Sequence, residues 1–419
     1  MTKACRGGNL PSAGLQKIRL AALLTALLIG LSGCASLWER EIYERSPHIT
    51  QEDDGAFSAT MTVNSYDSLK SAIVSAIRNG ERVADIRVTD YPGGLTSLSL
   101  TALLDEIQKQ EPIGAYAVEY MAHDLSRVLS QYIITLNIVY KHGSRPVITP
   151  VSGRRELEDA VRSALMEYVG LLTVEMPYFY ARDHDVEGMV RAYYYGSPGS
   201  AMEYPGVAVS LFPPSGGPLS RIVELELTWQ TPAAELMRKS SAAESRAALL
   251  LTGLQGFAGG MEEVAAQTVL WLYETLCGAV EYDEDTAMLA AATETRQGGD
   301  AYTAYGALVN HLAVSEGTAM AFKLLCDMLG IEAHVVTGRW WGNEHAWNLV
   351  KIGEHWYHAA IALDSRGPVP AHDYFLLSDD SDVMGSLFQW DKSLYPAAEP
   401  GPWTAETIRA LTEEEEVDG

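Results

Sequence analysis

One pattern occurs twice before residue 232 and limits what this chain can fold into. The segments SYDSLKSAIVSAI, from Ser65, and GRRELEDAVRSAL, from Gly153, carry apolar residues at matching positions. These positions recur at i, i+3, i+4, i+7 and i+8, which is the spacing of the buried stripe of an amphipathic helix. The matched pairs are Leu69 with Leu157, Ala72 with Ala160, Ile73 with Val161, Ala76 with Ala164, and Ile77 with Leu165. A duplicated helical unit is therefore expected.

Strand-like segments follow each of the two helices. RVADIRV comes after the first helix and LLTVEM after the second, and each unit closes on an alternating segment, YIITLNIVY from Tyr132 and RIVELELTW from Arg221. Alternation of apolar and polar residues is typical of a half-buried strand. The sequence thus predicts two small α/β modules, at residues 58–143 and 147–231, that form a duplication and not a solenoid.

The second module also carries the tyrosine-rich segments YFYARDHD and RAYYYGS. They can be interpreted as an aromatic patch that stacks against sugars or peptides, or as a sheet face and hairpin, which their β propensity favours.

From Pro232 the pattern becomes helical and then changes to strands. The helical segments are AAELMRKSSAAESRAALLLTGL, EEVAAQTVLWLYETLCGAV and a helix that begins near Ser315. The strands are AHVVTG, HAWNLVKI and HWYHAAIAL, and a tight turn at Gly353 and Glu354 joins the last two. Helices followed by an antiparallel sheet indicate an α+β domain, here residues 232–400. Residues 401–419 are expected to be a solvated acidic tail.

Ser315 lies where a nucleophile would be placed. On the helix that follows it, Ala321, Leu324, Leu325 and Met328 form one apolar face, and Gly330 stands at a C-cap position. The N-terminus of a helix carries unpaired N–H groups and a positive partial charge, which would lower the pKa of a cysteine there.

The same region resembles a known family. The run YGALVNHLAVSEGTAMAFKLLCDMLGIEAHVVTG, continued by EHAWNLVKIGEHWYH and HDYFLLSDD, resembles the transglutaminase-like superfamily. Three places carry the resemblance: a V-C-x-G helix start, an H-A-W-N strand and a W-Y-x-x-D strand. The resemblance covers Ala301 to Pro396 and implies a papain-like core with a Cys-His-Asp triad.

Mapped onto this chain, the family's cysteine falls at Ser315, its histidine at His345 and its aspartate at Ala360. Two catalytic side chains are therefore replaced, while fold-bearing residues such as Gly317 and Asn348 remain. The resemblance implies a degenerate triad on an α+β fold, with the two duplicated modules preceding a transglutaminase-like domain.

Two interpretations of these positions stay open. Ser315 and His345 could act as a dyad, although loss of the orienting acid costs such enzymes roughly 10⁴ in turnover. Alternatively Ser315 is a helix N-cap and His345 is a satisfied, semi-buried side chain or a ligand contact. Asp364 is a poor substitute for the acid, because four residues of strand would place it roughly 13 Å beyond Ala360.

Three tryptophans near the histidine are candidate ligand contacts. Trp340 and Trp341 precede the His345 strand, and Trp347 lies within it. Tryptophans on a loop can hold a ligand by stacking, or one of them can cap the core. No cofactor is expected, and no metal site either, because His355 and His358 should face opposite sides of a sheet.

The N-terminus indicates the cellular location. Basic residues precede an apolar run from Leu20 to Leu31, which is too short to span a bilayer comfortably and is typical of a secretory signal. Its end, Leu31-Ser32-Gly33-Cys34, resembles the lipobox of bacterial lipoproteins. That resemblance implies a signal peptide at residues 1–33, lipidation of Cys34, a tether at residues 34–57 and an extracytoplasmic protein anchored to a membrane.

Charge and cysteine usage narrow the function further. Without the signal, 26 basic residues face 55 acidic ones, a net charge of −29, which disfavours nucleic acid as a partner. Cys277 and Cys326 lie in apolar helical contexts, where free thiols are favoured over a disulfide.

Three functions remain as hypotheses. The first is an inactive transglutaminase-like domain that binds a peptide or a cell-envelope polymer. The second is a hydrolase or acyltransferase that uses Ser315 and His345. The third is ligand binding by the N-terminal modules, with the C-terminal domain as a scaffold.

Overall fold

The computed structural model describes residues 61–142, 147–180, 182–215, 220–254, 256–257, 259–293, 299–365 and 370–418, with side chains up to residue 411. The predicted signal at residues 1–33, the lipidation site Cys34 and the tether at residues 34–57 lie outside these ranges. Across the described ranges, no helix has both the length and the apolar character needed to cross a membrane.

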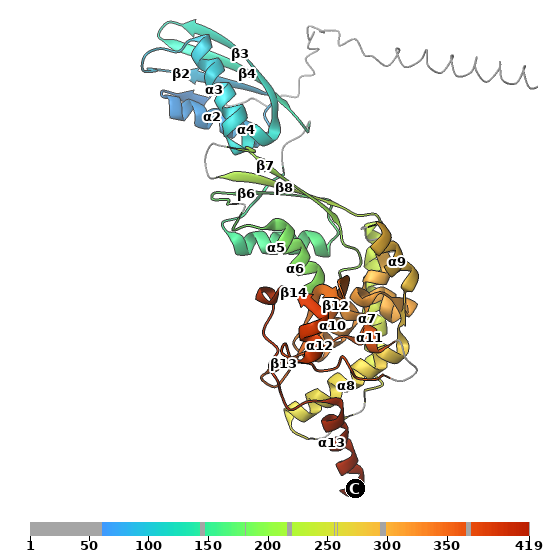
Figure 1. The fold of residues 1–419 in the computed structure, drawn as a ribbon. Coiled ribbons are helices and arrows are strands. Elements are labelled where there is room, and N and C mark those ends of the chain that lie inside the picture. The colour runs from blue at the N-terminus through green and yellow to red at the C-terminus, as the bar shows by residue number, and fades with distance from the viewer. Residues whose placement is uncertain are drawn as a thin grey trace, which may run out of the picture. The chain divides into compact units, whose positions relative to one another are not determined.

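The first module is a four-stranded sheet with three helices (Figure 1). Its strand order is β1-β2-β4-β3; β1 and β2 are parallel and the other pairs are antiparallel. The elements are β1 (Met61–Val63), α2 (Tyr66–Asn79), β2 (Val83–Val88), α3 (Ser97–Gln110), α4 (Pro112–Ala117), β3 (Val118–Val128) and β4 (Gln131–Tyr140).

Local sequence explains why α2 begins and ends where it does. Ser65 caps the helix in a capping box with Ser68, and Gly80 ends it in the left-handed conformation at φ 73°. All five residues of the predicted apolar stripe, from Leu69 to Ile77, are buried. This helix was therefore predicted correctly from its apolar stripe, and the caps explain its bounds.

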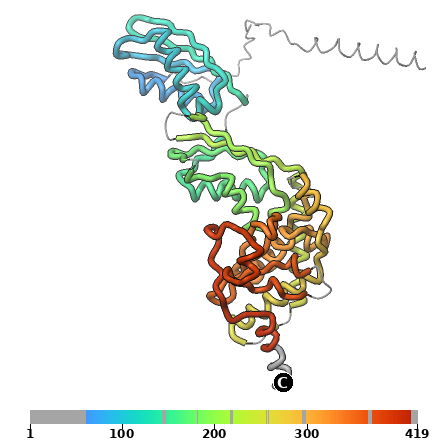
Figure 2. The backbone as a smooth tube through the Cα atoms, in the orientation of Figure 1, coloured from blue at the N-terminus to red at the C-terminus, as the bar shows by residue number. Residues whose placement is uncertain are grey.

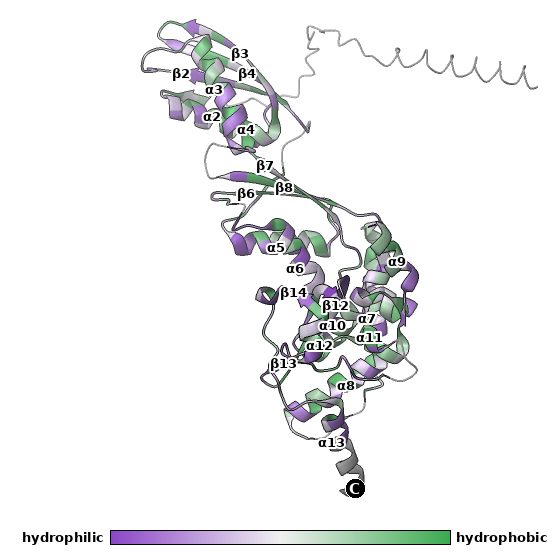
Figure 3. Cartoon of the chain, viewed as in Figure 1, coloured by the Kyte–Doolittle hydropathy of each residue, from purple (hydrophilic) through white to green (hydrophobic). Residues whose placement is uncertain are grey.

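The second module repeats the topology of the first. Its sheet order is β5-β6-β8-β7, again with the first pair parallel and the other pairs antiparallel. Its elements are β5 (Thr149–Pro150), α5 (Arg154–Met166), β6 (Leu171–Met176), α6 (Val186–Gly196), β7 (Gly206–Phe212) and β8 (Arg221–Thr228). Polar and apolar residues share the turns of α5, as expected of an amphipathic helix (Figure 3). The predicted fold class with two duplicated α/β modules is confirmed.

The interpretation of RAYYYGS as a sheet face and hairpin was wrong. This segment belongs to helix α6 and not to a sheet face or hairpin, and Asp185 caps the helix by accepting a hydrogen bond from the Gly188 N–H. Tyr194 is buried and donates a hydrogen bond to the Tyr302 carbonyl, so it packs in the core.

The C-terminal domain is built around a four-stranded antiparallel sheet of order β13-β12-β11-β14. Its main elements are α7 (Ala233–Leu251), α8 (Met261–Ala279), α9 (Glu284–Thr293), α10 (Ser315–Leu329), β11 (Ala333–Trp340), β12 (Asn343–Ile352), β13 (His355–Ala359), α11 (Ile361–Asp364), α12 (Asp382–Leu387), β14 (Phe388–Trp390) and α13 (Ala405–Asp418). Shorter segments are β9 (Glu281–Tyr282), η2 (Gly299–Tyr302), η3 (Gly306–Asn310), β10 (Leu312–Ala313) and η4 (Lys392–Leu394). Figure 2 follows the backbone through them.

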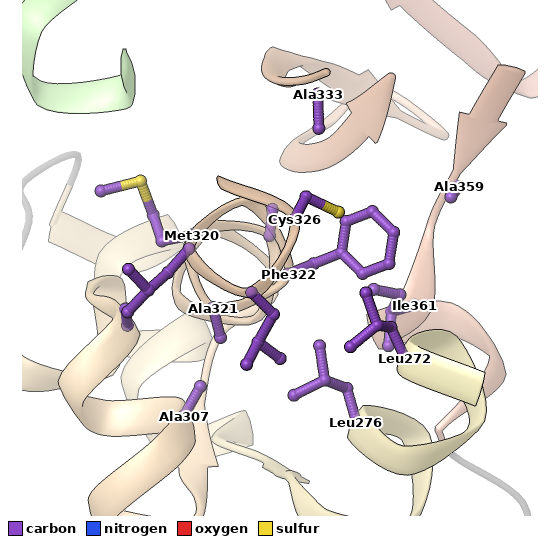
Figure 4. Packing of buried hydrophobic residues seen from close by; sticks show 14 of the residues in the cluster. Leu272, Leu276, Ala307, Met320, Ala321, Phe322, Cys326, Ala333, Ala359 and Ile361 are labelled. Carbon is purple, nitrogen blue, oxygen red and sulfur yellow. The ribbon is translucent and has the colours of Figure 1, made fainter. Parts of the chain in front are cut away.

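Helix α10 lies in the centre of the largest apolar core. Its residues from Ser315 to Cys326 are all buried. Phe322 and Cys326 pack among side chains that include Leu272, Leu276 and Ile361 (Figure 4). The thiols of Cys326 and Cys277 are free and buried, as predicted, and burial raises the pKa of Cys277 to about 12.

One further prediction about this domain was wrong. The strand predicted for HWYHAAIAL ends at Ala359, and helix α11 follows. The acidic tail at residues 401–419 contains α13 from Ala405, and Ile408 of this helix is only 1% exposed because its side chain enters the core. The side chains of the acidic end, EEEEVDG, lie outside the described residues.

Candidate functional site

Ser315 is the first helical residue of α10. The N-cap is Val314, whose backbone is extended and whose side chain cannot accept a capping bond. The Ser315 hydroxyl oxygen instead accepts a hydrogen bond from the Ala346 N–H on β12, at 3.2 Å. The interpretation of Ser315 as an N-cap was therefore wrong, because its side chain bonds to the neighbouring strand.

Close backbone contacts fix the start of α10. A Cβ atom on Gly317 would lie 2.3 Å from the Ala301 carbonyl oxygen, so this position has no room for a side chain. The Val314 N–H also donates to the Ala301 carbonyl, at 3.0 Å. On the other side, the Asn348 amide of β12 donates to the Ala319 carbonyl at 2.9 Å. The helix start is thus held between η2 and β12.

His345 lies on β12, one residue before the amide that binds Ser315. It pairs with Gly338 of β11, and its side chain is 8% exposed. Its ring lies 6.3 Å from the Trp347 ring at an interplanar angle of 20°, and 6.0 Å from the Trp340 ring. The structure therefore bonds Ser315 to the residue that follows His345 in the chain, and places aromatic rings around the histidine.

Ala360 occupies the third position of the expected triad. It is 2% exposed and stands at the N-terminus of α11, where its N–H donates to the Tyr374 carbonyl at 3.0 Å. It belongs to an apolar cluster that also contains Trp347 and Leu349. At this position the Ala360 methyl group contributes to the packing of the apolar cluster.

Asp364 is directed to other partners. Its carboxylate accepts a hydrogen bond from the Tyr273 hydroxyl at 2.6 Å and one from the Tyr374 N–H at 3.3 Å. Burial raises the pKa of Asp364, and burial together with the nearby carboxylate raises the pKa of Tyr273 well above its usual value. The prediction that Asp364 lies on a strand, roughly 13 Å beyond Ala360, was wrong because Asp364 lies on helix α11. The two hydrogen bonds that its carboxylate accepts give Asp364 a structural role.

A buried hydrogen-bond chain beneath His345 was not predicted from the sequence. The Trp347 indole N–H donates to Nδ1 of His358 at 2.9 Å, and Nε2 of His358 lies 2.8 Å from the Asp379 carboxylate. Because Nδ1 accepts, Nε2 carries the proton and donates to Asp379. Burial lowers the pKa of His358, which therefore stays neutral. The chain orients the indole that faces His345.

The three tryptophans have different environments. Trp341 is 68% exposed and Trp340 is half-buried, with their ring centroids 6.4 Å apart. Trp347 is only 1% exposed, so the prediction that it contacts a ligand does not fit this structure; its ring and N–H are used in the core. Trp340 and Trp341 are the tryptophans that a ligand could reach.

Trp341 forms the tip of the β11–β12 hairpin together with Gly342. Both residues have positive φ, 51° and 78°, which defines a two-residue turn of the kind that favours Asn-Gly. A bulky residue in this conformation is strained, and such strain occurs most often at functional sites.

The residues that the structure describes include no group of three or more His, Cys, Asp or Glu side chains that could hold a metal ion.

Comparison with protein families identifies one region of the chain. Residues 255–361 match the model of the transglutaminase-like superfamily, and this range contains Ser315, His345 and Ala360. The chain therefore contains a transglutaminase-like domain at residues 255–361, as the sequence motifs predicted.

Two solved structures are similar to the chain at low identity. One is the crystal structure of a TGase, with 13% identity, a TM-score of 0.25, and coverage of 57% of this chain and 63% of that chain. The other is a candidate cysteine protease from Cytophaga hutchinsonii, with 14% identity, a TM-score of 0.22, and coverage of 35% and 55%. The chain thus covers less than two thirds of either structure. No curated protein has significant sequence similarity to it.

Proposed function

We propose that this protein is a lipid-anchored, extracytoplasmic bacterial protein whose transglutaminase-like domain binds a peptide or a cell-envelope polymer and does not catalyse acyl transfer. The observation that carries the proposal is the state of the triad positions. Ala360 supplies a buried methyl group where the family has a carboxylate. Ser315 is 7% exposed, and its hydroxyl oxygen accepts a hydrogen bond from the Ala346 N–H.

This arrangement does not favour nucleophilic catalysis. A serine hydroxyl becomes a nucleophile when an oriented base removes its proton, whereas a cysteine already supplies some thiolate at neutral pH. At Ser315 the oxygen accepts an N–H hydrogen bond, which lowers the electron density available for attack. In Ser-His-Asp enzymes, replacing the acid by its amide alone costs roughly 10⁴ in turnover, and an alanine offers no hydrogen bond.

Binding is supported by the tryptophans at the hairpin tip. Trp341 exposes 68% of its surface in a strained backbone conformation, beside the half-buried Trp340. An exposed aromatic side chain of this size adds apolar contact area and stacks against sugar rings, peptide bonds or other aromatic rings. Both components of a bacterial cell-wall polymer, sugar and peptide, present such surfaces.

A fluorophosphonate probe tests the absence of catalysis. We expect no labelling of the purified chain that depends on Ser315, because the hydroxyl is bonded and unactivated. Labelling of the wild type that disappears in Ser315→Ala would refute the inactive domain and establish the serine hydrolase. The Ser315→Ala variant is a fair control because it keeps every backbone group of the α10 start.

Co-sedimentation with cell-wall sacculi and binding to their soluble fragments test the ligand class. Trp341→Ala should weaken binding about tenfold, the effect of losing one stacking contact of about 1.4 kcal/mol. Tyr178→Ala is the matched control, since Tyr178 is a 63% exposed aromatic residue of the second module. Equal losses in the two variants, or no binding by the wild type, would reject the proposed ligand site.

The anchor is tested separately by mass spectrometry of the mature N-terminus. We expect a diacylated or triacylated Cys34 and loss of membrane association in Cys34→Ser. An unmodified cysteine in the membrane fraction would contradict the lipoprotein assignment.

A further inference from the structure

Strand β3 forms one edge of the first module's sheet. It has eleven residues and pairs with β4 on one side, and none of the described strands pairs with its other side (Figure 1). Most of its side chains are exposed, among them Glu119, Tyr120 and Arg127. A long exposed edge presents unpaired N–H and C=O groups, which can pair with another strand.

The hairpin geometry shows which groups of β3 are unpaired. Val128 and Gln131 pair across a two-residue loop, and the pair that closes such a loop exchanges hydrogen bonds. The register is regular from Tyr120 to Val128, so even-numbered residues bond to β4. The odd-numbered residues from Met121 to Arg127 therefore direct their N–H and C=O groups outward. Glu119 lies in a bulge, and its carbonyl accepts a hydrogen bond from the Gln108 side chain, so it is not bonded to β4.

We propose that β3 pairs antiparallel with β3 of a second copy of this chain, with the twofold axis at His123. In this register Met121 lies opposite Leu125 of the other copy, and Glu119 lies opposite Arg127. Met121, His123 and Leu125 direct their backbone groups outward, so in this register they meet as hydrogen-bonded pairs, whereas the Glu119 carbonyl already accepts from the Gln108 side chain and Glu119 contributes its charge. Apolar and opposite-charge pairs across strands are stabilising.

The sequence VEYMAHDLSRV selects this register over its neighbours. A shift of two residues in one direction places Arg127 opposite Met121, and a shift in the other direction places Glu119 opposite Leu125. Both shifts break the charge pair and leave an ionic group facing an apolar one. A shift of one residue mismatches the backbone donors and acceptors altogether.

The faces of the two sheets also match in the proposed pairing. Met121 and Leu125 are half-buried and pack against the first module's core, on the side of the sheet that carries the helices. The perpendicular twofold axis places the helices of both copies on the same side, so the apolar rims adjoin and the two sheets become one of eight strands. Such an isologous contact closes as a dimer.

Charge reversal and restoration test the pairing. We expect the full chain with Cys34→Ser, which excludes association through lipid, to sediment as a dimer. Glu119→Arg and Arg127→Glu should each weaken the dimer at least about tenfold, because each places like charges opposite one another at two symmetric points. The double variant restores the pair and should return to within about threefold of the parent. Arg87→Glu, on an exposed position of β2, is the control and should leave the dimer unchanged.

Disulfide trapping tests the register independently. In a background that also carries Cys5→Ser, His123→Cys should form an intermolecular disulfide readily, because directly opposed residues of a hydrogen-bonded pair have Cα atoms about 5.5 Å apart. Asp124→Cys should not, since residue 124 would lie opposite residue 122.

Each result decides for or against the dimer. Failure of the double variant to recover, or equal crosslinking at positions 123 and 124, would overturn the proposed register. A parent chain that stays monomeric at high concentration would overturn the dimer. If the outward-facing amides of β3 in that monomer were protected from hydrogen exchange, another segment would cover this edge of the sheet.

Discussion

Replacing Trp347 by phenylalanine should loosen the sheet beneath His345. The indole N–H is the donor that satisfies Nδ1 of His358, at 2.9 Å, and both side chains are 1% exposed. Phenylalanine keeps an aromatic ring in the core, but it removes this hydrogen-bond donor. Its side chain is also smaller than that of tryptophan, so it leaves unfilled space in the core. The perturbation thus separates the hydrogen bond from aromatic character as such.

The expected magnitude follows from burial. Leaving a buried acceptor without a donor costs about 1–3 kcal/mol, and the space left by the smaller ring adds about 1 kcal/mol. The sum, about 3 kcal/mol, corresponds to an increase of about a hundredfold in local opening. Water cannot compensate readily, because His358 is enclosed on all described sides by Trp347, Asp379 and the apolar cluster around them.

Hydrogen exchange measured by mass spectrometry is the suitable assay, because it resolves β12 and β13 from the two N-terminal modules. The most protected amides of β12 should exchange about a hundredfold faster in Trp347→Phe. Trp341→Phe is the matched control, since its 68% exposed ring should leave exchange unchanged. An acceleration below about threefold in Trp347→Phe would show that the indole bond does not hold this part of the sheet.

Three further predictions concern other contacts. Burial lowers the pKa of His358, so below about pH 6.5 the folded state binds fewer protons than the unfolded state. The free energy of unfolding should therefore be highest above about pH 6.5 and fall as the pH is lowered. His358→Gln should reduce this pH dependence in urea titrations at about pH 5 and about pH 7. Gly317→Ala places a Cβ 2.3 Å from the Ala301 oxygen and should lower the melting temperature by at least about 5 °C, unlike Gly278→Ala, which meets nothing within 4 Å. Ile408→Asp buries a charge under α13 and should release this helix to limited proteolysis; an unchanged digestion pattern would contradict its docking.

The elements predicted well are those whose signals are local. Helix α2 has its cap at Ser65, its stripe from Leu69 to Ile77 and its terminator at Gly80, all within its own sequence. The alternation in YIITLNIVY likewise defined β4, because one face of the strand is buried and the other is half-buried.

The elements predicted wrongly depend on tertiary contacts or on weak signals. The tyrosines of RAYYYGS have high β propensity, but Asp185 caps a helix there and Tyr194 packs toward Tyr302. The apolar run after Ala359 is compatible with either a strand or a helix. In the structure it forms helix α11, in which the Asp364 carboxylate accepts hydrogen bonds from the Tyr273 hydroxyl and the Tyr374 N–H. Neither contact is visible in a local window.

The candidate site shows the same division. The motifs around Ser315 and His345 predicted that the two segments would meet, and the hydrogen bond from the Ala346 N–H to Ser315 joins those segments, while the pairing of the two side chains stays a prediction. The chain from Trp347 through His358 to Asp379 was missed, because its members are 11 and 21 positions apart and a strand pattern gives no sign of which ring nitrogens meet.

The hydrogen bond between Ser315 and Ala346 makes helix and strand mechanically dependent on each other. A displacement of β12 by one ångström would stretch the 3.2 Å contact beyond hydrogen-bonding range. A ligand that binds at Trp341 and displaces the β11–β12 hairpin would therefore also displace the N-terminus of α10, the central helix of the core. Ligand binding at the hairpin tip would in this way change the rigidity of the whole domain.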